Sequence, residues 1–259
     1  MLTVGITGQN GFIGTHLFNY LSLKENELKL LPFDDTYFKN NKILISWVRK
    51  CDVIVHLAAM NRHEDQTVIY NTNINLVKQL INVLEESNKT PHILFSSSSQ
   101  ENRENGYGKS KKEGRELFIK WARKNNARFT GMVIPNVFGP YGKPFYNSVV
   151  ATFCYQLTHS EKPKIDIDGI LKLIYVGELA EVIYNIIVEG KSADEFHVLH
   201  SHEIKVSEIL KLLEEFKLVY IDNRLSPRLN DQFEENLFNT FLSFVAQDRI
   251  VSGKFSGKN

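Results

Sequence analysis

Three glycines, Gly8, Gly11 and Gly14, stand between an apolar run at residues 2–6 and a helical pattern. A chain that passes from a buried strand through such a turn into a helix directs backbone N–H groups and the positive end of the helix dipole at one point. That point suits the pyrophosphate of a dinucleotide. The spacing Gly-x-x-Gly-x-x-Gly is wider at its start than the commonest fingerprint, and an ordinary strand-to-helix turn is the alternative. The flanking strand and helix favour phosphate binding.

Composition limits the classes of protein that fit. With 259 residues the chain can form one large α/β domain, or a main domain with a small appendage. Its 31 basic and 30 acidic residues nearly cancel, which disfavours binding to nucleic acid or to an anionic membrane surface. No apolar run approaches the roughly 20 residues that a membrane-spanning helix needs.

The two cysteines indicate the compartment. Cys51 and Cys154 lie far apart, no Cys-x-x-Cys is present, and the N-terminus has a strand pattern in place of a secretory signal. We therefore expect reduced cysteines and a cytoplasmic location.

Strand and helix patterns alternate through the first half of the chain. Strands are expected at residues 28–33, 53–57, 93–96 and 128–134, and amphipathic helices at 71–86 and 109–124. This alternation predicts an α/β fold with a doubly wound parallel sheet of the Rossmann type. Ligands bind such sheets at the carboxyl ends of the strands, where Gly8, Asp34, Ala58, Ser98 and Pro135 fall.

The pattern loosens after about residue 140. Helices are expected near residues 148–157, 179–188, 206–216 and 233–244, and a strand near 171–176. We predict a dinucleotide-binding core at residues 1–140 and a small substrate-binding portion at 141–251 that returns in part to the core. Residues 252–259 are expected to form a mobile tail.

A serine-rich strand end and a tyrosine–lysine pair suggest the chemistry. Ser98 belongs to a run of four serines, and Tyr107 and Lys111 follow at the start of a helix. Residues four apart share one helix face, so the ammonium can lower the pKa of the phenol and make it a usable general acid. A serine hydroxyl can then hold the substrate oxygen. The alternatives are a surface pair on a helix and a polar strand end.

The same spacing occurs a second time. Tyr20 and Lys24 lie in the first predicted helix, where neither is placed to meet the crevice. Spacing alone is therefore weak evidence, and position after the fourth strand is what favours Tyr107 and Lys111.

Several motifs together resemble the extended short-chain dehydrogenase/reductase family. They are the glycine turn at 7–14, His-Leu-Ala-Ala at 56–59, the serine strand, the Tyr107/Lys111 pair and Pro-Asn-Val-Phe-Gly-Pro at 135–140. Residues 143–155 and 224–243 look like one subgroup, the reductase domain of CapF-like capsular polysaccharide enzymes. That subgroup continues into a metal-binding cupin domain, which catalyses C3 epimerisation.

The resemblance implies a ketoreductase that uses NADPH or NADH. Hydride would pass to the C4 keto carbon of a UDP-linked 4-keto-6-deoxy-2-acetamido sugar, for capsular or surface polysaccharide synthesis. Tyr107 would donate the proton, Lys111 would bind the nicotinamide ribose, and Ser98, with Ser97 as the alternative, would hold the developing alkoxide.

The same motifs imply a set of cofactor and substrate residues. Those expected at the cofactor are Gly8, Gln9, Gly11, Phe12, Ile13, Leu57, Ala58, Ala59, Asn73, Lys111 and Pro135. Those expected at the substrate are Asn61, Arg62, Asn136, Lys143, Tyr146, Asn147 and Arg224. For Asn73, a solvated helix position is the alternative. For the substrate residues, an ordinary surface position is the alternative.

The position of Asp34 bears on the choice of cofactor. It ends the second strand about 20 residues beyond the glycine turn, where a carboxylate can bind a ribose hydroxyl and repel a 2′-phosphate. This favours NADH, whereas the resembled subgroup favours NADPH.

Two further clusters are expected to carry no chemistry. His197, His200 and His202 lack the pattern of a metal site, and we expect no metal. Asp166 and Asp168 are expected at the end of a strand that leads into a turn.

Two other functions remain as alternatives. One is a nucleotide-sugar epimerase or dehydratase that keeps and recycles NAD, although Ser99 and Gln100 stand where a dehydratase usually has an added acid pair. The other is a non-catalytic cofactor-sensing protein on the same fold. The resemblance also suggests a homodimer formed through the helices near 71–86 and 109–124. A separate cupin protein is one expected partner for the C3 step, and a cupin domain in a longer chain is the alternative.

Overall fold

A computed structural model of the chain describes residues 1–245. It forms two compact units: Met1–Pro135 with Val176–Leu199, and Asn136–Tyr175 with the chain from His200 onward. The chain thus leaves the first unit after Pro135 and returns to it over Val176–Leu199. The tail expected at residues 252–259 lies outside the described residues.

The first unit is built on a six-stranded sheet with the order β2-β1-β3-β4-β5-β8, and every neighbouring pair is parallel. The strands are β1 Leu2–Thr7, β2 Leu28–Leu31, β3 Val53–His56, β4 His92–Ser98, β5 Phe129–Ile134 and β8 Ala193–His197. The predicted doubly wound parallel sheet is confirmed. Because β2 and β3 pair with opposite sides of β1, the strand order reverses between β1 and β3, and ligands bind at such a switch point.

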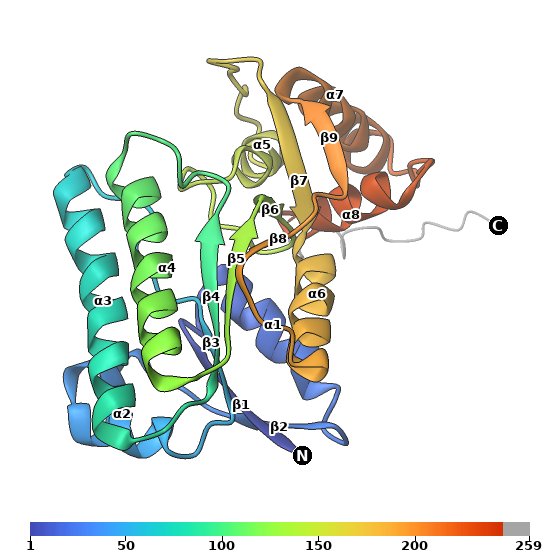
Figure 1. The fold of residues 1–259 in the computed structure, drawn as a ribbon. Helices are drawn as coiled ribbons and strands as arrows, with labels where there is room; N and C mark the ends of the chain where they lie inside the picture. The colour runs from blue at the N-terminus through green and yellow to red at the C-terminus, as the bar shows by residue number, and fades with distance from the viewer. Residues whose placement is uncertain (246–259) are drawn as a thin grey trace. The chain divides into compact units, whose positions relative to one another are not determined.

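Helices cover both faces of this sheet (Figure 1). The short α2 (Asn41–Val48), α3 (Gln66–Ser87) and α4 (Gly106–Asn125) pack together on one face, and α1 (Phe12–Ser22) and α6 (Val176–Glu189) pack on the other. Every residue of β3, β4 and β5 is buried, as expected for parallel strands covered on both sides.

Side-chain caps set the start of the two helices that flank the candidate site. Asp65 accepts a hydrogen bond of 2.7 Å from the backbone N–H of Thr67 at the start of α3. Asn105 does the same for Gly108 at the start of α4, also at 2.7 Å. These bonds satisfy N–H groups that a helix leaves without internal partners. Tyr107 is therefore held in the capped first turn of α4.

The second unit combines a small sheet with a group of helices. Strand β7 (Ile170–Tyr175) is parallel to β6 (Asn136–Phe138) and antiparallel to β9 (His202–Lys205). The helices are α5 (Val149–Thr158), α7 (Val206–Phe216), the π-helix η2 (Lys217–Asp222) and α8 (Gln232–Leu242). Apolar residues from both the strands and the helices, among them Phe138, Leu213 and Phe241, form the core of this unit. The helices and the strand predicted beyond residue 140 are thus present.

Some short elements were not predicted, namely α2, β6, β8, β9 and the 3-10 helix η1 (Asp35–Lys39). The strand expected to end at Asp166 and Asp168 is absent, because β7 begins only at Ile170. Asp168 instead accepts hydrogen bonds of 2.8 Å from the backbone N–H and the hydroxyl of Ser207 at the start of α7.

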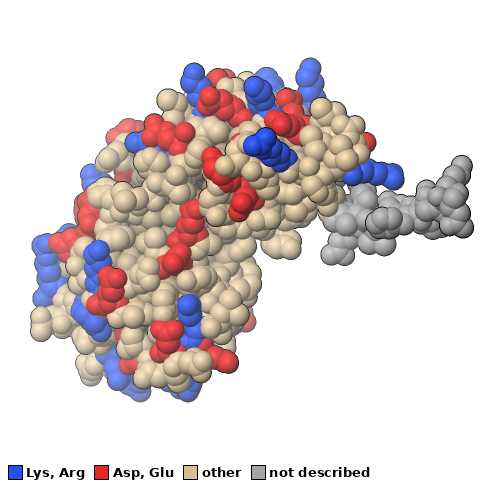
Figure 2. Space-filling view, turned by 90° about the vertical axis from the view of Figure 1, so that its right-hand side faces the viewer, with Lys and Arg blue, Asp and Glu red and all other residues tan. Residues whose placement is uncertain are grey.

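The charge distribution on the surface and the lengths of the helices can be compared with the classes of protein that the sequence disfavours. On the face drawn in Figure 2, basic and acidic side chains are interspersed, which agrees with the near-zero net charge. No helix within residues 1–245 is both long and apolar enough to cross a lipid bilayer.

Candidate active site

The glycine turn after β1 has a backbone that side chains would block. Gly8 has φ +70°, and a Cβ there would lie 2.8 Å from the backbone nitrogen of Ala58. A Cβ on Gly14 would lie 2.2 Å from the carbonyl oxygen of Gly8. Gly11, the N-cap of α1, makes no side-chain cap bond, in contrast to Asp65 and Asn105 on α3 and α4. This close-packed, uncapped helix start fits the pyrophosphate of a dinucleotide, with Phe12 and Ile13 as the first helical residues.

Hydrogen bonds join this turn to the end of β3. The Thr7 hydroxyl lies 2.7 Å from Nδ1 of His56 and accepts a bond of 3.4 Å from the N–H of Ala58. Burial, together with the nearby charge of Lys111, lowers the pKa of His56 to about 3, so the imidazole is neutral near pH 7. Leu57, Ala58 and Ala59 follow this anchored point and are only partly buried. The turn after β1 and the turn after β3 are therefore held together by hydrogen bonds at the ends of the two strands.

The other side of the turn is hydrogen-bonded to the segment that follows β2. The Gln9 side chain accepts a bond of 3.1 Å from the N–H of Phe33. The expectation that Asp34 ends the second strand is wrong, because β2 ends at Leu31 and Asp34 is the N-cap of η1. Asp34 is exposed, and its carboxylate accepts a bond of 2.8 Å from the N–H of Thr36. Hydrogen bonds from Thr36 lower the pKa of Asp34, so the carboxylate predicted to select the cofactor is charged.

Asn73 is buried. The alternative prediction, that Asn73 is a solvated residue on a helix, is therefore wrong. Its amide accepts from the N–H of Met60 at 2.7 Å and donates to the carbonyl of Met60 at 2.9 Å. It also donates to the hydroxyl of Ser110 at 2.9 Å. Asn73 therefore links the segment after β3 to α4, the helix that carries Tyr107 and Lys111.

The serines at the end of β4 have different partners. The Ser97 hydroxyl donates to the carboxylate of Glu101 and lies 3.4 Å from the carbonyl oxygen of Lys111. The Ser98 hydroxyl accepts a bond of 3.2 Å from the N–H of Gln100. Accepting that bond leaves the Ser98 proton available to a substrate oxygen. The contacts therefore favour Ser98 over Ser97 for the predicted role.

Lys111 lies in the interior of the first unit. It is 3% exposed, and its Nζ donates to the carbonyl of Ser96 at 2.8 Å. The same atom lies 5.6 Å from the ring centre of Tyr107 and 5.2 Å from that of Phe95. Burial lowers the pKa of Lys111 to about 7, against the opposing charge of Glu101. The predicted pair is thus assembled, with the cation next to the phenol ring.

One charged pair next to the serines was missed by sequence reasoning. Glu101 is buried and forms a two-pronged ion pair with Arg115 of α4. The two N–O distances are 2.9 and 2.7 Å. Arg115 lies one helical turn beyond Lys111 and two beyond Tyr107, a spacing that puts all three on one helix face. That spacing was the available signal.

The remaining candidates of the first unit follow strand ends. Asn61 is partly buried and Arg62 is exposed, and both lie in the segment between β3 and α3. Pro135 directly follows β5. These positions agree with the carboxyl edge of the sheet, where the prediction places the ligands.

The second unit holds the other substrate candidates. Nζ of Lys143 lies 4.9 Å from the ring centre of Tyr146, and Asn147 is exposed nearby in sequence. Asn136 begins β6, and the exposed Arg224 has φ +57° just after η2. Tyr141 and Phe145, in the segment of Lys143 and Tyr146, also have positive φ. Left-handed backbone at non-glycine residues is often retained at binding sites.

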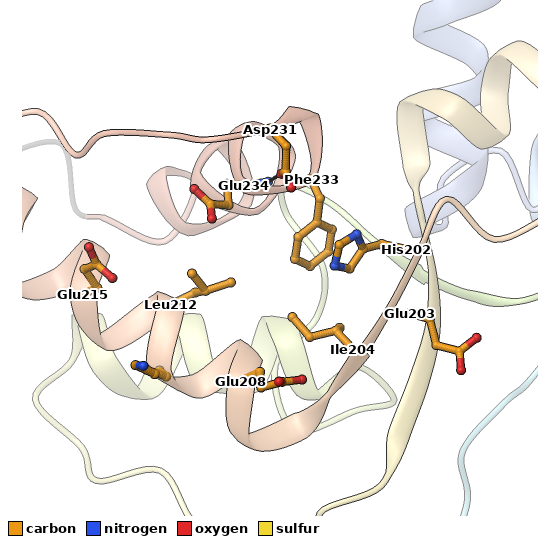
Figure 3. A pocket seen from close by; sticks show the side chains of 10 residues that line it. His202, Glu203, Ile204, Glu208, Leu212, Glu215, Asp231, Phe233 and Glu234 are labelled. Carbon is orange, nitrogen blue, oxygen red and sulfur yellow. Dashed lines mark hydrogen bonds between the residues drawn. The ribbon is translucent and has the colours of Figure 1, made fainter.

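A cavity of about 450 Å³ lies in the second unit between β9, α7 and the start of α8 (Figure 3), and none of the predicted site residues lines it. The rings of His202 and Phe233 stack at its side, 3.8 Å apart. Among its carboxylates, Glu208 accepts a bond from the N–H of Lys205, and Glu234 accepts one from that of Asn230. Its acidic residues therefore include helix-capping groups.

Within residues 1–245, no group of three or more His, Cys, Asp or Glu side chains is placed to hold a metal ion. His197 pairs with Glu195 at 2.7 Å, and His200 with Glu203 at 3.4 Å.

A protein-family model matches residues 4–199, which include the glycine turn, the serine strand and the Tyr107/Lys111 pair. The chain belongs to the NAD dependent epimerase/dehydratase family. The match confirms the predicted resemblance and the predicted class of NAD(P)-dependent enzyme.

One curated protein and two solved structures illustrate what the chain is similar to. The chain is 28% identical over 253 residues to UDP-2-acetamido-2,6-beta-L-arabino-hexul-4-ose reductase of Pseudomonas aeruginosa, over 95% of this chain and 66% of that protein. The capsular polysaccharide assembling protein CapF of Staphylococcus aureus is 30% identical, with a TM-score of 0.79 over the same shares. The chain thus spans about two thirds of the length of both. RMD of Pseudomonas aeruginosa, complexed with NADPH, is 18% identical with a TM-score of 0.80 over 95% of this chain and all of that one, and it shares the fold.

Proposed function

We propose that this protein reduces the C4 keto group of a UDP-linked 4-keto-6-deoxy-2-acetamido sugar with NADPH or NADH, in the synthesis of a capsular or surface polysaccharide precursor. The observation that carries the proposal is the buried Nζ of Lys111, 5.6 Å from the ring centre of Tyr107 and bonded to the serine-bearing strand. The relative in Pseudomonas aeruginosa is named as a reductase of such a sugar, which supports the substrate class.

In the proposed reduction, Tyr107, Ser98 and Lys111 each have a separate role. When bound, the reduced nicotinamide supplies a hydride to the carbonyl carbon. Tyr107 gives its phenolic proton to the carbonyl oxygen, so an alcohol and oxidised cofactor result. Ser98 donates a hydrogen bond to the same oxygen while its charge develops. Lys111, when protonated, stabilises the tyrosinate that remains.

On the substrate side, cationic and polar groups are proposed to bind the diphosphate and the sugar. Lys143 and Arg224 suit phosphate because their charge and donors match its oxygens. Asn61, Arg62, Asn136, Tyr146 and Asn147 complete the proposed set. Replacing Lys143 with Met is expected to raise KM for the nucleotide sugar and to leave the binding of NAD(P)H unchanged.

The proposed choice of cofactor depends on Asp34. The charged, exposed carboxylate in the segment that follows β2 disfavours a 2′-phosphate, which supports NADH. The ratio of kcat/KM for NADH and NADPH, in the native protein and in Asp34→Ala, tests this role. A strong native preference for NADPH would refute it.

The family description favours an epimerase or dehydratase as the second candidate. Such an enzyme regenerates its cofactor in each turnover, whereas a reductase consumes it. Glu101, the carboxylate beside the serines, is engaged by Arg115 and is therefore poorly suited to act as an added base. Incubation with UDP-4-keto-6-deoxy sugars, followed by cofactor absorbance and product NMR, separates the two: one cofactor oxidised per alcohol formed supports the reductase.

The proposal includes a division of labour at C3. We expect a cupin, as a separate protein or as a further domain of a longer chain, to epimerise C3, and residues 1–259 to reduce the product. In deuterated water without the cupin protein, the chain is then expected to leave the C3 proton in place. Rapid deuterium incorporation at C3 would favour the epimerase.

We also propose that the protein forms a homodimer through α3 and α4. We propose a cytoplasmic location, which suits the unpaired cysteines.

A further inference from the structure

The ion pair of Glu101 and Arg115 is buried beside residues that the proposed reaction uses. The Glu101 side chain is 8% exposed and that of Arg115 is 10% exposed. Burial alone would raise the pKa of Glu101, but hydrogen bonds from Arg115 and Ser97 lower it, so the carboxylate is charged. Two charges in this position have lost much of their hydration and depend on each other for stability.

The Arg115 side chain crosses strand β5 at a position where the strand has a glycine. A Cβ on Gly131 of β5 would lie 2.6 Å from Cδ of Arg115, so a glycine is what lets the side chain cross that strand. Beyond β5 the guanidinium reaches β8, where it bonds the carbonyl of Asp194 at 3.3 Å and the carboxylate of Glu195 at 3.1 Å. Arg115 thus joins α4 to the segment after β4 and to β8.

The pair also contacts the candidate site through one serine. Glu101 accepts a hydrogen bond from the Ser97 hydroxyl, and the Ser97 oxygen lies 3.4 Å from the carbonyl oxygen of Lys111. Ser97 precedes Ser98 on β4, and Arg115 lies one turn beyond Lys111 on α4. The pair therefore joins the strand end that carries Ser98 to the helix that carries Tyr107 and Lys111.

We propose that Glu101 and Arg115 are positioning residues, which hold Ser98 on β4 in register with Tyr107 and Lys111 on α4. The proposal rests on the proposed reductase function. It differs from a purely structural role in one respect: replacing both charges with apolar groups of similar size can preserve stability but cannot restore the bond to Ser97.

The test uses the double variant Glu101→Leu/Arg115→Met. Its melting temperature is expected to stay within a few degrees of that of the native protein. Its kcat is expected to fall at least tenfold, with KM for NAD(P)H changed less than twofold. Recovery of native kcat together with native stability would overturn the proposal. Ser97→Ala is expected to produce part of the same loss of kcat.

A matched control lies on the same two elements. Arg123 of α4 pairs with the side chain of Asp194 on β8 at 2.5 Å, but both side chains are exposed. Arg123→Met removes an α4–β8 ion pair away from the serines and is expected to leave kcat within twofold. A loss equal to that of the double variant would show that any α4–β8 link has this effect, and would overturn the specific role of Glu101 and Arg115.

Amide hydrogen exchange tests the positioning role without turnover. In the double variant, exchange at residues 97–101 and in the first turn of α4 is expected to rise at least tenfold, while α3 and β1 are unchanged. Unchanged exchange in these segments would overturn the proposal. If the native protein turns over no 4-keto sugar, the proposed function fails, and the exchange result alone decides the positioning role.

Discussion

The molecule contains two tyrosine–lysine pairs with the same spacing and nearly the same geometry, but with different surroundings. Nζ of Lys24 lies 5.7 Å from the ring centre of Tyr20, and that of Lys111 lies 5.6 Å from the ring centre of Tyr107. Lys24 is partly exposed and also lies 4.9 Å from the ring centre of Tyr184 on α6. Lys111 is buried and bonded to the serine strand.

The surroundings give the two pairs different roles. Tyr184 stacks edge-on against Tyr20, and its hydroxyl donates to Glu27, which raises the pKa of that phenol. The first pair therefore belongs to a contact between the α1 region and α6. Spacing determines how far a lysine lies from a tyrosine, whereas the position in the sheet determines whether the two can act on a ligand.

The largest expected difference between the pairs is in turnover. Tyr107→Phe removes the proposed proton donor, and general acids contribute about 10²- to 10⁴-fold to rates. We expect kcat to fall about a thousandfold, with the affinity for NAD(P)H largely kept. Tyr20→Phe is the control and is expected to change kcat less than twofold. Equal effects of the two substitutions on steady-state kinetics would remove the distinction.

Replacing the lysine of each pair tests whether its charge contributes to turnover. Lys111→Met removes a cation beside the proposed proton donor, and we expect kcat/KM to fall about a hundredfold, as for other lost charge-stabilising groups. Lys24→Met is expected to leave kcat/KM within twofold. Near-native kcat/KM in Lys111→Met would contradict the assignment.

Burial of Lys111 also predicts a pH dependence of stability. Its pKa is about 7 in the folded protein and near 10.5 when unperturbed. Between these values the unfolded chain binds one more proton, so this residue makes the free energy of unfolding rise with pH by up to about 1.4 kcal/mol per unit. In urea unfolding, the free energy of unfolding of the native protein, relative to that of Lys111→Met, should be larger at pH 9 than at pH 7. A constant difference between the two proteins would contradict the lowered pKa of the buried Lys111.

The smallest expected effect is the stability contributed by the first pair. Lys24 lies over two aromatic rings at a partly exposed site, where such contacts contribute roughly 0.5–1 kcal/mol each. Lys24→Met should therefore lower the free energy of unfolding by about 1 kcal/mol in urea titrations at neutral pH. No change would reduce this pair to an incidental surface contact.

Much of the first unit could be predicted because its signals are local. The glycine turn, the buried strands and the Tyr107/Lys111 spacing each lie within a few residues of sequence. The short strands β6, β8 and β9 could not be predicted because polar or charged residues interrupt their three to five residues, whereas the equally short β3 is a continuous buried run. β8 also carries Asp194 and Glu195 on an edge, where charged residues are common but weaken a strand pattern.

The supporting contacts of the candidate site could not be predicted in the same way. Asn73 lies on a polar stretch of α3 that looks solvated, and only the packing of α3 on α4 buries it against Met60 and Ser110. Glu101 and Arg115 are 14 residues apart and meet only after β4 and α4 have packed. Local patterns identify the reacting residues, whereas tertiary packing determines which residues support them.

The transfer of the hydride itself tests the central claim most directly. NAD(P)H carrying deuterium at the transferable position of C4 would be incubated with a UDP-4-keto-6-deoxy-2-acetamido sugar and the native chain, and the product read by NMR and mass spectrometry. We expect one deuterium at sugar C4 for each cofactor oxidised, and none with Tyr107→Phe over the same time. A sugar that changes configuration with no net oxidation of the cofactor and no deuterium at C4 would contradict it.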